Sequence, residues 1–264
     1  MPESFKFIKS LGQNILTDKN IIAKIILACG LEKNDIVLEI GPGMGALSGD
    51  IARSVKELTC VDLDRRMCEA LKGQLGLFSN VKIICADILK LDFRPFQGLK
   101  IIGSLPYYIT TPIINYLLDN RAHIKEVYLI IQKEVGERLL ARPRTKDYSS
   151  FNCLVNYFAK PKILFYIKNT CFFPRPKVES ALVKLEILES PRVKVSDEKL
   201  FLKVLRMSFA KRRKTLLNNL KEVITKENFE KFIQEKSFRK EVRAEELTLE
   251  DFASLVSYIE ANML

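Results

Sequence analysis

The architecture of this chain is indicated by the stretch Val37-Leu38-Glu39-Ile40-Gly41-Pro42-Gly43-Met44-Gly45. An apolar run that carries one acidic residue gives way to three glycines, and a helical pattern follows from Ala46 to Arg53. Glycines in a strand-to-helix turn allow positive φ and leave no Cβ in the way, so the backbone can touch a ligand. The pattern alone is a weak signal, because a tight turn without any ligand can carry the same glycines.

Two further strand ends add acidic residues to this pattern. The spacing Gly-x-Gly-x-Gly lacks the third glycine position of the dinucleotide fingerprint, and it resembles the Glu-x-Gly-x-Gly-x-Gly motif of S-adenosylmethionine-dependent methyltransferases. A second apolar run ends at Asp62, about twenty residues beyond the first glycine, where a carboxylate can accept hydrogen bonds from both ribose hydroxyls. A third run ends in Ala86-Asp87, where a carboxylate could accept from an adenine amino group. Taken singly, Asp64 and Asp87 could equally be helix N-caps.

Apolar runs and helical patterns alternate along the first part of the chain. Strands are expected near residues 36–40, 58–62, 81–85, 100–104, 126–131, 162–168 and 181–188, with helices at 18–29, 46–54, 65–77, 111–119 and 132–141. This alternation predicts an α/β fold with a mostly parallel sheet, helices on both faces and ligands at the carboxyl ends of the strands. The resemblance of the glycine motif implies that this sheet is the Rossmann-like sheet of a class I methyltransferase. Strand 181–188 has nearly alternating apolar residues and is expected to be a late antiparallel strand.

The pattern changes after residues 189–195. Beyond them, polar segments carry apolar residues at helical spacing, which predicts a small all-helical C-terminal domain. We therefore expect two domains, over residues 1–190 and 196–264. The resemblance of the glycine motif implies that the first is the methyltransferase domain, and the charge and the family resemblance described below imply that the second binds RNA or the ribosome.

The charge of the chain points to a polyanionic partner. A net charge of +11 favours nucleic acid over a small neutral substrate. A basic cluster falls within nine residues on an expected helix, without an acidic residue between its members, which are Arg206, Lys211, Arg212, Arg213 and Lys214. Such a cluster can neutralise phosphates and would make RNA binding strongly dependent on salt. The alternative is a solvated helix face.

Composition excludes several classes of protein. No segment reaches the length of a transmembrane helix and the N-terminal residues lack an apolar secretory core, so a cytoplasmic protein without a membrane partner is expected. The six cysteines contain no Cys-x-x-Cys pair, and with the single histidine, His123, they leave no plausible zinc set, so no metal is expected. A histidine base is excluded unless His123 supplies it, and a solvated surface position is expected for that residue. No conspicuous apolar interface pattern occurs, which favours a monomer.

The segment Gly103-Ser104-Leu105-Pro106-Tyr107-Tyr108 has the residues needed to hold an exocyclic amine. An amine such as adenine N6 is a poor nucleophile, because its lone pair is delocalised into the ring. The Ser104 hydroxyl and the Leu105 carbonyl could accept its hydrogens, and Pro106 would fix the direction of that carbonyl. Tyr107 would stack on the base, so that catalysis would rest mostly on positioning. The alternative is a strand exit with an X-Pro bond and packed tyrosines.

Together these motifs resemble the KsgA-type (RsmA) small-subunit ribosomal RNA adenine N6,N6-dimethyltransferases along nearly the whole chain. The segments that carry the resemblance are Leu11-Gly12-Gln13-Asn14-Ile15-Leu16, the loop with Gly41, Gly43 and Gly45, Asp62, Asp87, Ser104-Leu105-Pro106-Tyr107, Gln132-Lys133-Glu134-Val135 with Arg138, Lys146-Asp147-Tyr148, Phe172-Phe173-Pro174-Arg175-Pro176-Lys177-Val178-Glu179-Ser180, Arg212-Arg213-Lys214-Thr215-Leu216 and Arg243-Ala244-Glu245-Glu246-Leu247. Each is weak by itself, but their order is very specific. Two substitutions depart from the family pattern: Ser104 stands where the family has Asn, and Asp62 where many relatives have Glu.

The resemblance implies an enzyme that uses S-adenosylmethionine to dimethylate N6 of two adjacent adenosines. These would lie in a hairpin loop near the 3′ end of small-subunit ribosomal RNA, within a pre-ribosomal particle. The cofactor-binding residues implied are Gln13, Asn14, Leu16, Gly41, Gly43, Gly45, Asp62, Asp87 and Ser104. The catalytic residues implied are Ser104, Leu105, Pro106, Tyr107 and Phe172, the aromatic that packs against the target base. The basic cluster would hold phosphates of the RNA.

Three other functions are compatible with some of these residues. The related large-subunit methyltransferase that confers macrolide resistance shares fold and chemistry, but the Phe-x-Pro-x-Pro-Lys-Val motif and the Arg-Ala-Glu-Glu-Leu ending favour the small-subunit enzyme. A non-catalytic RNA-binding assembly or transcription factor is kept open by Ser104, whereas the intact glycines and aspartates of the cofactor site argue against it. A small-molecule methyltransferase fits poorly with the charge of +11 and the helical appendage.

Overall fold

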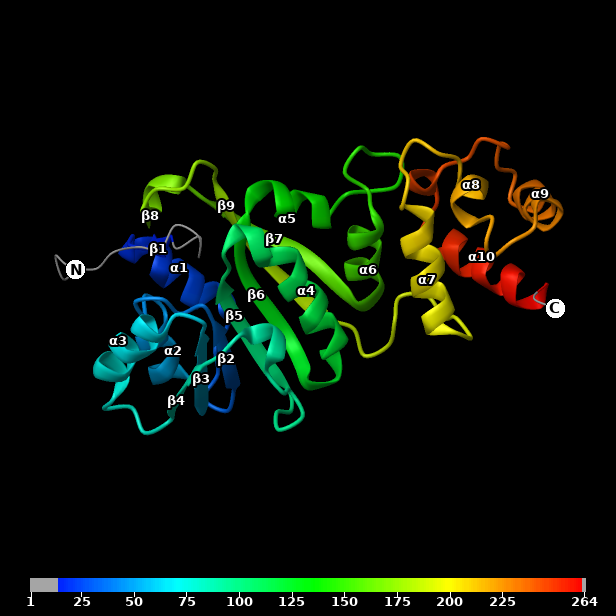
Figure 1. Cartoon of the computed structure of the whole chain (residues 1–264). Coiled ribbons are helices and arrows are strands. Elements are labelled where there is room, and N and C mark those ends of the chain that lie inside the picture. The colour runs from blue at the N-terminus through cyan, green and yellow to red at the C-terminus, as the bar shows by residue number, and fades with distance from the viewer. Residues whose placement is uncertain (1–13, 263–264) are drawn as a thin grey trace. The chain divides into compact units, whose positions relative to one another are not determined.

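The computed structural model describes residues 14–262 of the chain (Figure 1). Contacts divide the chain into two compact units, one built from the chain up to Glu137 with Lys160–Ile187, and the other from Arg138–Ala159 with the chain from Leu188 onward. These units differ from the expected segments 1–190 and 196–264 chiefly because residues 138–159 group with the C-terminal part. The assignment of RNA or ribosome binding to that part stays a prediction.

The first unit contains a seven-stranded sheet in the order β4-β3-β2-β5-β6-β9-β7. Its strands are β2 (Ile36–Ile40), β3 (Glu57–Asp62), β4 (Val81–Cys85), β5 (Leu99–Ser104), β6 (Ile124–Gln132), β7 (Ala159–Ile167) and β9 (Ser180–Ile187). The pairings from β4 through β6 are parallel, and β9 runs antiparallel to β6 with Val183 opposite Leu129. The mostly parallel sheet and the late antiparallel strand are therefore confirmed.

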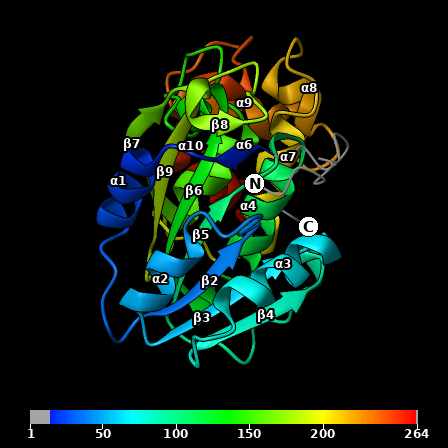
Figure 2. The ribbon, with the colours of Figure 1, turned by 90° about the vertical axis from the view of Figure 1, so that its left-hand side faces the viewer.

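Helices cover both faces of this sheet (Figures 1 and 2). One apolar cluster joins β2, β3, β5 and β6 to three helices, α1 (Lys19–Cys29), α2 (Ser48–Ser54) and α3 (Arg65–Leu75). The opposite face carries α5 (Lys133–Leu139), since a Cβ on its Gly136 would lie 3.1 Å from Cγ2 of Val183. The preceding residue of β9, Leu182, points to the other side of the sheet and belongs to the cluster on the first face. In Figure 1, α4 (Thr110–Asp119) lies across the sheet in front of β6.

Short polar signals determine where the helices beside the sheet begin and end. Asp18 accepts hydrogen bonds from the backbone nitrogens of Asn20 and Ile21 at the start of α1, and Gly30 ends that helix with a left-handed φ of 52°. Asp64 starts α3 by accepting from the backbone nitrogen of Arg66. The helix that follows β3 thus begins immediately after the carboxyl end of the strand.

A separate two-stranded sheet pairs β1 (Ile15–Leu16) with β8 (Phe172–Phe173). The strands are antiparallel, with Ile15 opposite Phe173 and Leu16 opposite Phe172. The backbone nitrogen and Oγ1 of Thr17 both donate to the carbonyl oxygen of Cys171, at 2.9 and 3.2 Å, and fasten the two segments together. Neither strand was expected from the sequence, because two residues carry no periodicity.

The second unit is helical. Its helices are α6 (Ser150–Phe158), α7 (Glu198–Ser208), α8 (Leu216–Leu220), α9 (Lys226–Glu235) and α10 (Leu249–Ala261). The ring of Tyr157 on α6 lies 4.6 Å from that of Phe201 on α7, and both side chains are fully buried. The helix α6, which the sequence pattern did not reveal, is held in this unit by such contacts. Among residues 14–262, no helix has the length and apolar character needed to cross a membrane.

Candidate active site

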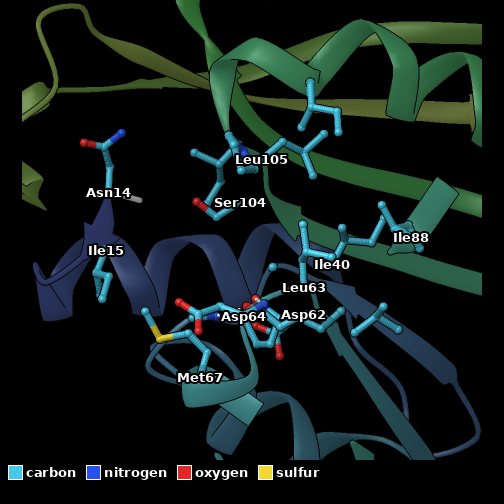
Figure 3. Close-up of a pocket in the computed structure, with 18 of the residues that line it drawn as sticks. Asn14, Ile15, Ile40, Asp62, Leu63, Asp64, Met67, Ile88, Ser104 and Leu105 are labelled. Carbon is cyan, nitrogen blue, oxygen red and sulfur yellow. Dashed lines mark hydrogen bonds between the residues drawn. The ribbon is translucent and has the colours of Figure 1, made fainter. Parts of the chain in front are cut away.

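A pocket opens where β2, β3 and β5 end (Figure 3). The strand β2 lies between β3 and β5. From β2 the chain adds β3 and β4 on one side of the sheet, and it then returns to add β5 and β6 on the other side, so the strand order reverses beside β2. Open α/β sheets bind ligands at such a switch point, outside the carboxyl ends of the strands. The predicted site residues that line the pocket are Asn14, Leu16, Gly41, Gly43, Asp62, Asp87, Ser104, Leu105, Pro106, Tyr107 and Phe172.

The glycine loop brings backbone to the wall of this pocket. Gly41 has a φ of 64°, and a Cβ there would lie 3.2 Å from the carbonyl oxygen of Ser104, so a side chain would press against the end of β5. Gly45, which was predicted to bind the cofactor, takes part in packing the loop. It does not line the pocket, and a Cβ on it would lie 2.7 Å from Oε1 of Gln74 and 3.0 Å from Cδ2 of Leu71. Gly45 therefore lets the loop pack on α3.

Asp62 is oriented by two backbone hydrogen bonds. Its Oδ2 accepts from the nitrogen of Gly43 at 3.2 Å, and its Oδ1 accepts from the nitrogen of Asp64 at 2.8 Å. Burial raises the pKa of this carboxyl above its ordinary value, although both backbone donors lower it. Each carboxylate oxygen has a second lone pair, so Asp62 keeps the capacity to accept two hydroxyl donors from a ligand.

The other two aspartates of this edge act as helix caps. Asp64 caps α3 and also forms an ion pair with Arg66, with 2.6 Å between Oδ2 and Nη2. Oδ1 of Asp87 accepts from the backbone nitrogen of Leu89, at 3.0 Å, and so caps the short 3-10 helix Ile88–Lys90. Both aspartates line the pocket. Asp87 is thus a helix N-cap, as its sequence position allowed. Because the cap uses Oδ1, Oδ2 of Asp87 can also accept a hydrogen bond from a ligand.

Glu39 is a pocket residue that the sequence reasoning quoted but did not place in the site. Its side chain is 2% exposed at the end of β2, and Sγ of Cys60 donates to its Oε2 at 3.6 Å. Burial raises the pKa of Glu39 to about 7, although the neighbouring Ser48 and Cys60 side chains lower it. The acidic position of the glycine motif was the signal that could have found it.

The end of β5 carries the segment predicted to hold an amine. Ser104 is the last residue of β5, and the backbone nitrogen of Leu105 donates to the carbonyl oxygen of Ile130 on β6 at 3.1 Å. Tyr107 begins a 3-10 turn, and its hydroxyl lies 2.9 Å from Oγ of Ser180. Figure 3 shows Ser104 and Asn14 on one side of the pocket and Asp62 and Met67 on the other.

Phe172 reaches the same pocket from β8. It is 5% exposed and belongs to the apolar cluster that joins the sheet to α1, α2 and α3, as does its strand partner Leu16. Pocket residues that sequence reasoning did not predict include Ile15, Leu63, Met67 and Ser180. Gln13, predicted to bind the cofactor, lies outside the described residues.

The basic cluster belongs to the second unit, and its expected helix is shorter than predicted. Arg206 lies on α7, which ends at Ser208, and residues 211–214 form an exposed turn before α8. The side-chain amide of Asn219 donates to the carbonyl oxygen of Ser208, the last residue of α7, at 2.6 Å. Arg212 donates from Nη2 to the carbonyl oxygen of Lys146. The prediction of a continuous helix through the cluster was therefore wrong.

Residues 4–261 match the family model described as ribosomal RNA adenine dimethylase. The chain belongs to this family. The dimethylase family is one of S-adenosylmethionine-dependent class I methyltransferases, which agrees with the glycine loop and with the carboxylates at the ends of β2 and β3. This chain is accordingly a methyltransferase that uses S-adenosylmethionine to dimethylate adenine of small-subunit ribosomal RNA.

Curated relatives of this dimethylase cover nearly its whole length. Two proteins called ribosomal RNA small subunit methyltransferase A, from Clostridium acetobutylicum and from Clostridium botulinum (strain Loch Maree / Type A3), are 39% and 41% identical to it, over 96% and 95% of this chain and 93% of each relative. The protein of that name from Caldanaerobacter subterraneus subsp. tengcongensis is 41% identical over 94% of this chain and 96% of its own.

Solved structures agree on the fold of the dimethylase. A dimethyladenosine transferase from Plasmodium falciparum superposes with a TM-score of 0.78 and 27% identity, covering 94% of this chain and 98% of its own. The 23S rRNA methyltransferase ErmE superposes with a TM-score of 0.73 and covers 93% of this chain and 99% of its own. ErmE is only 22% identical, so this likeness shows the fold alone.

Proposed function

We propose that the target of this dimethylase is a pair of adjacent adenosines in a hairpin loop near the 3′ end of small-subunit ribosomal RNA. We propose further that they are modified within a pre-ribosomal particle by a monomer acting in the cytoplasm. The observation that carries the proposal is the meeting of the glycine loop and the Ser104–Tyr107 segment in one pocket. A duplex would hide N6, so the adenosine must come from a loop or leave the stack.

In this proposal the ends of β2, β3 and β4 hold S-adenosylmethionine, which supplies an electrophilic methyl group. The backbone at Gly41 and Gly43 leaves room for its close approach. Asp62 would accept from the ribose hydroxyls, and Asp87 would accept from the adenine amino group. Met67, Ile88 and Leu63 would give the adenine ring apolar contacts, since all three line this part of the pocket.

The end of β5 would hold the target adenine. The Ser104 hydroxyl and the Leu105 carbonyl would accept the hydrogens of N6, which directs the lone pair of nitrogen towards the methyl carbon. Tyr107 would stack on the base, and Phe172 would face it from β8. N6 loses one proton for each methyl group that it gains. His123 does not supply the base, because its Nδ1 is 2.9 Å from the carbonyl oxygen of Phe96 and it does not line the pocket.

The second unit is proposed to bind the surrounding RNA. Four consecutive cations, Lys211 to Lys214, stand in an exposed turn, and Arg206 is exposed on α7. Phosphate contacts by such residues would fix the position of the particle without reading its sequence. This assignment rests on exposure and charge together with the family resemblance.

The test is transfer of labelled methyl groups to purified, under-methylated small ribosomal subunits, followed by digestion and separation of the nucleosides. We expect dimethyladenosine at two adjacent positions of the small-subunit RNA and no label on large subunits. Label on the large-subunit RNA alone would instead favour the macrolide-resistance reaction. No label on either subunit, with binding of S-adenosylmethionine intact, would contradict the proposal and favour a non-catalytic RNA-binding role.

A further inference from the structure

The strand β8 presents two consecutive phenylalanines to different surroundings. Phe172 lines the pocket and is 5% exposed, whereas Phe173 is 54% exposed. Successive side chains of a strand point to opposite sides, so Phe173 is turned away from the apolar cluster that takes Phe172. The strand thus has one phenylalanine in the pocket and one exposed aromatic ring beside it.

The register of the small sheet places Phe173 at the edge of the pocket. Its partner across β1 is Ile15, and directly opposed residues of an antiparallel pair share a face, with Cβ atoms about 5 Å apart. Ile15 lines the pocket, while Phe173 does not. Figure 3 shows the side chains of Ile15 and Asn14 on opposite sides of their strand at the left of the view. The exposed ring of Phe173 is thus adjacent to a lining side chain and outside the space proposed for the target base.

The segment that carries Phe173 is fixed by hydrogen bonds on both sides. Thr17 donates twice to the carbonyl oxygen of Cys171. Oδ1 of Asn169 accepts from Nε of Arg175 at 3.0 Å, and Nδ2 of Asn169 donates to the carbonyl oxygen of Pro176 at 3.2 Å. A pre-ordered segment loses little conformational freedom when it binds, which favours its use as a contact surface.

The charge of this segment matches a phosphate backbone. Residues 168–178 include Lys168, Arg175 and Lys177, all exposed, and no acidic residue. A base has a flat π face and each nucleotide adds a negative phosphate, so an aromatic ring among cations suits single-stranded nucleic acid. The next nucleotide along the strand is covalently joined to the target adenosine and must pass close to the rim of the pocket.

We propose that Phe173 is the stacking platform for the base of a nucleotide that directly flanks the target adenosine, with Arg175 on the adjoining phosphate. This site lies outside the cofactor and target-base sites, and it rests on the proposed function. It would hold the strand while the target base is in the pocket. Its contribution would appear in the affinity for RNA and not in the affinity for S-adenosylmethionine.

The experiment compares the wild-type chain with Phe173→Ala, Phe173→Leu and Phe173→Trp. Leu keeps apolar bulk without a ring, and Trp keeps a ring. Leu77→Ala is the matched control, because Leu77 is a fully exposed apolar residue of the same unit. The readouts are KM and kcat on under-methylated small subunits, the Kd of S-adenosylmethionine, and the fluorescence of a short loop RNA with 2-aminopurine on either side of the target adenosine.

We expect Phe173→Ala and Phe173→Leu to raise KM about ten-fold, as loss of one base–aromatic stack would, with the Kd of S-adenosylmethionine unchanged. Phe173→Trp and Leu77→Ala should keep the wild-type KM. The wild-type chain and Phe173→Trp should quench 2-aminopurine at one flanking position, and the Ala and Leu variants should not. Equal KM and equal quenching for wild type and Phe173→Ala would overturn the inference, even if methyl transfer proceeds. Failure of the wild-type chain to methylate any RNA would instead defeat the proposed function itself.

Discussion

The hydroxyl of Tyr107 lies 2.9 Å from Oγ of Ser180, and 73 positions of sequence separate the two residues. Tyr107 follows β5, and Ser180 is the first, fully buried residue of β9. Burial raises the pKa of the Tyr107 hydroxyl above its ordinary value, although the bond to Ser180 lowers it. The bond fixes the tilt of a ring that is proposed to stack on the target base.

We expect Tyr107→Phe and Ser180→Ala each to lower kcat about five-fold, because either change removes a hydrogen bond worth about 1 kcal/mol. The double variant should lose little more than either single variant, since both remove the same interaction. Steady-state kinetics on under-methylated small subunits gives the three values. Independent, multiplying losses would show that the two side chains act separately.

Substitution of Gly41 should weaken cofactor binding. In Gly41→Ala the new Cβ would lie 3.2 Å from the carbonyl oxygen of Ser104, which forces the loop away from β5. Gly98→Ala is the matched control, because Gly98 also has a positive φ of 62° but no atom within 4 Å of the added Cβ. Both variants should lose about 1–2 kcal/mol of stability from backbone strain. Calorimetry should show at least a ten-fold weaker Kd for S-adenosylmethionine in Gly41→Ala alone, and equal affinities would refute the contact.

Phe172→Ala tests the aromatic proposed to face the target base. Phe172 also belongs to the apolar cluster, so the variant should unfold about 3–5 kcal/mol more easily. Turnover on small subunits should fall at least ten-fold at a temperature where the variant is folded, as judged by circular dichroism. Phe172→Leu should recover most of the stability but little of the turnover. Wild-type turnover in Phe172→Ala would remove the residue from the site.

The stability of the chain should depend on the protonation of Glu39. Its pKa is raised from 4.5 to about 7 by burial, so the folded chain holds a proton there that the unfolded chain releases. Stability contributed by the neutral form is therefore complete below about pH 4.5, and it is lost as pH rises towards 7, by on the order of 3 kcal/mol.

The measurement is urea unfolding of the wild-type chain and of Glu39→Gln between pH 5 and 8. As pH rises, the free energy of unfolding of the wild-type chain should fall relative to that of Glu39→Gln. This difference between the two proteins should level off above pH 7. A difference that moves in favour of the wild type over this range would mean that the pKa of Glu39 is not raised.

The exposed turn of the second unit should contribute to RNA affinity through charge. Changing Lys211, Arg213 and Lys214 to Gln should weaken binding to small subunits and lower the slope of log K against log salt by about two to three. Arg212 is left unchanged because it donates to the carbonyl oxygen of Lys146. The control changes the exposed Lys199, Lys203 and Lys226 to Gln. The slopes are measured by filter binding over a series of salt concentrations. If both triple variants give the same slope, the proposed phosphate contacts are contradicted.

Local patterns in the sequence were sufficient for the α/β sheet. The apolar runs that end at Ile40, Asp62 and Cys85 each correspond to a strand, with boundaries within about one residue of those expected. The glycine loop and the two strand-end aspartates could be placed at one edge for the same reason, because parallel strands of a doubly covered sheet end together. The limit of such patterns appeared at the basic cluster, where the helix ends at Ser208 and the side-chain amide of Asn219 donates to the carbonyl oxygen of Ser208.

Sequence alone thus determined the class of fold, the carboxyl edge of the sheet as the ligand site, and eleven of the residues that line it, since each depends on local patterns in the chain. Tertiary structure alone decided that β1 pairs with β8, that Ser180 holds Tyr107, and that α6 packs with α7. Those contacts join residues far apart in the sequence. Two-residue strands and single side chains have no periodicity from which such contacts could be predicted. They become favourable only when the rest of the fold has brought the segments together and the entropy of closing the long loops has been overcome.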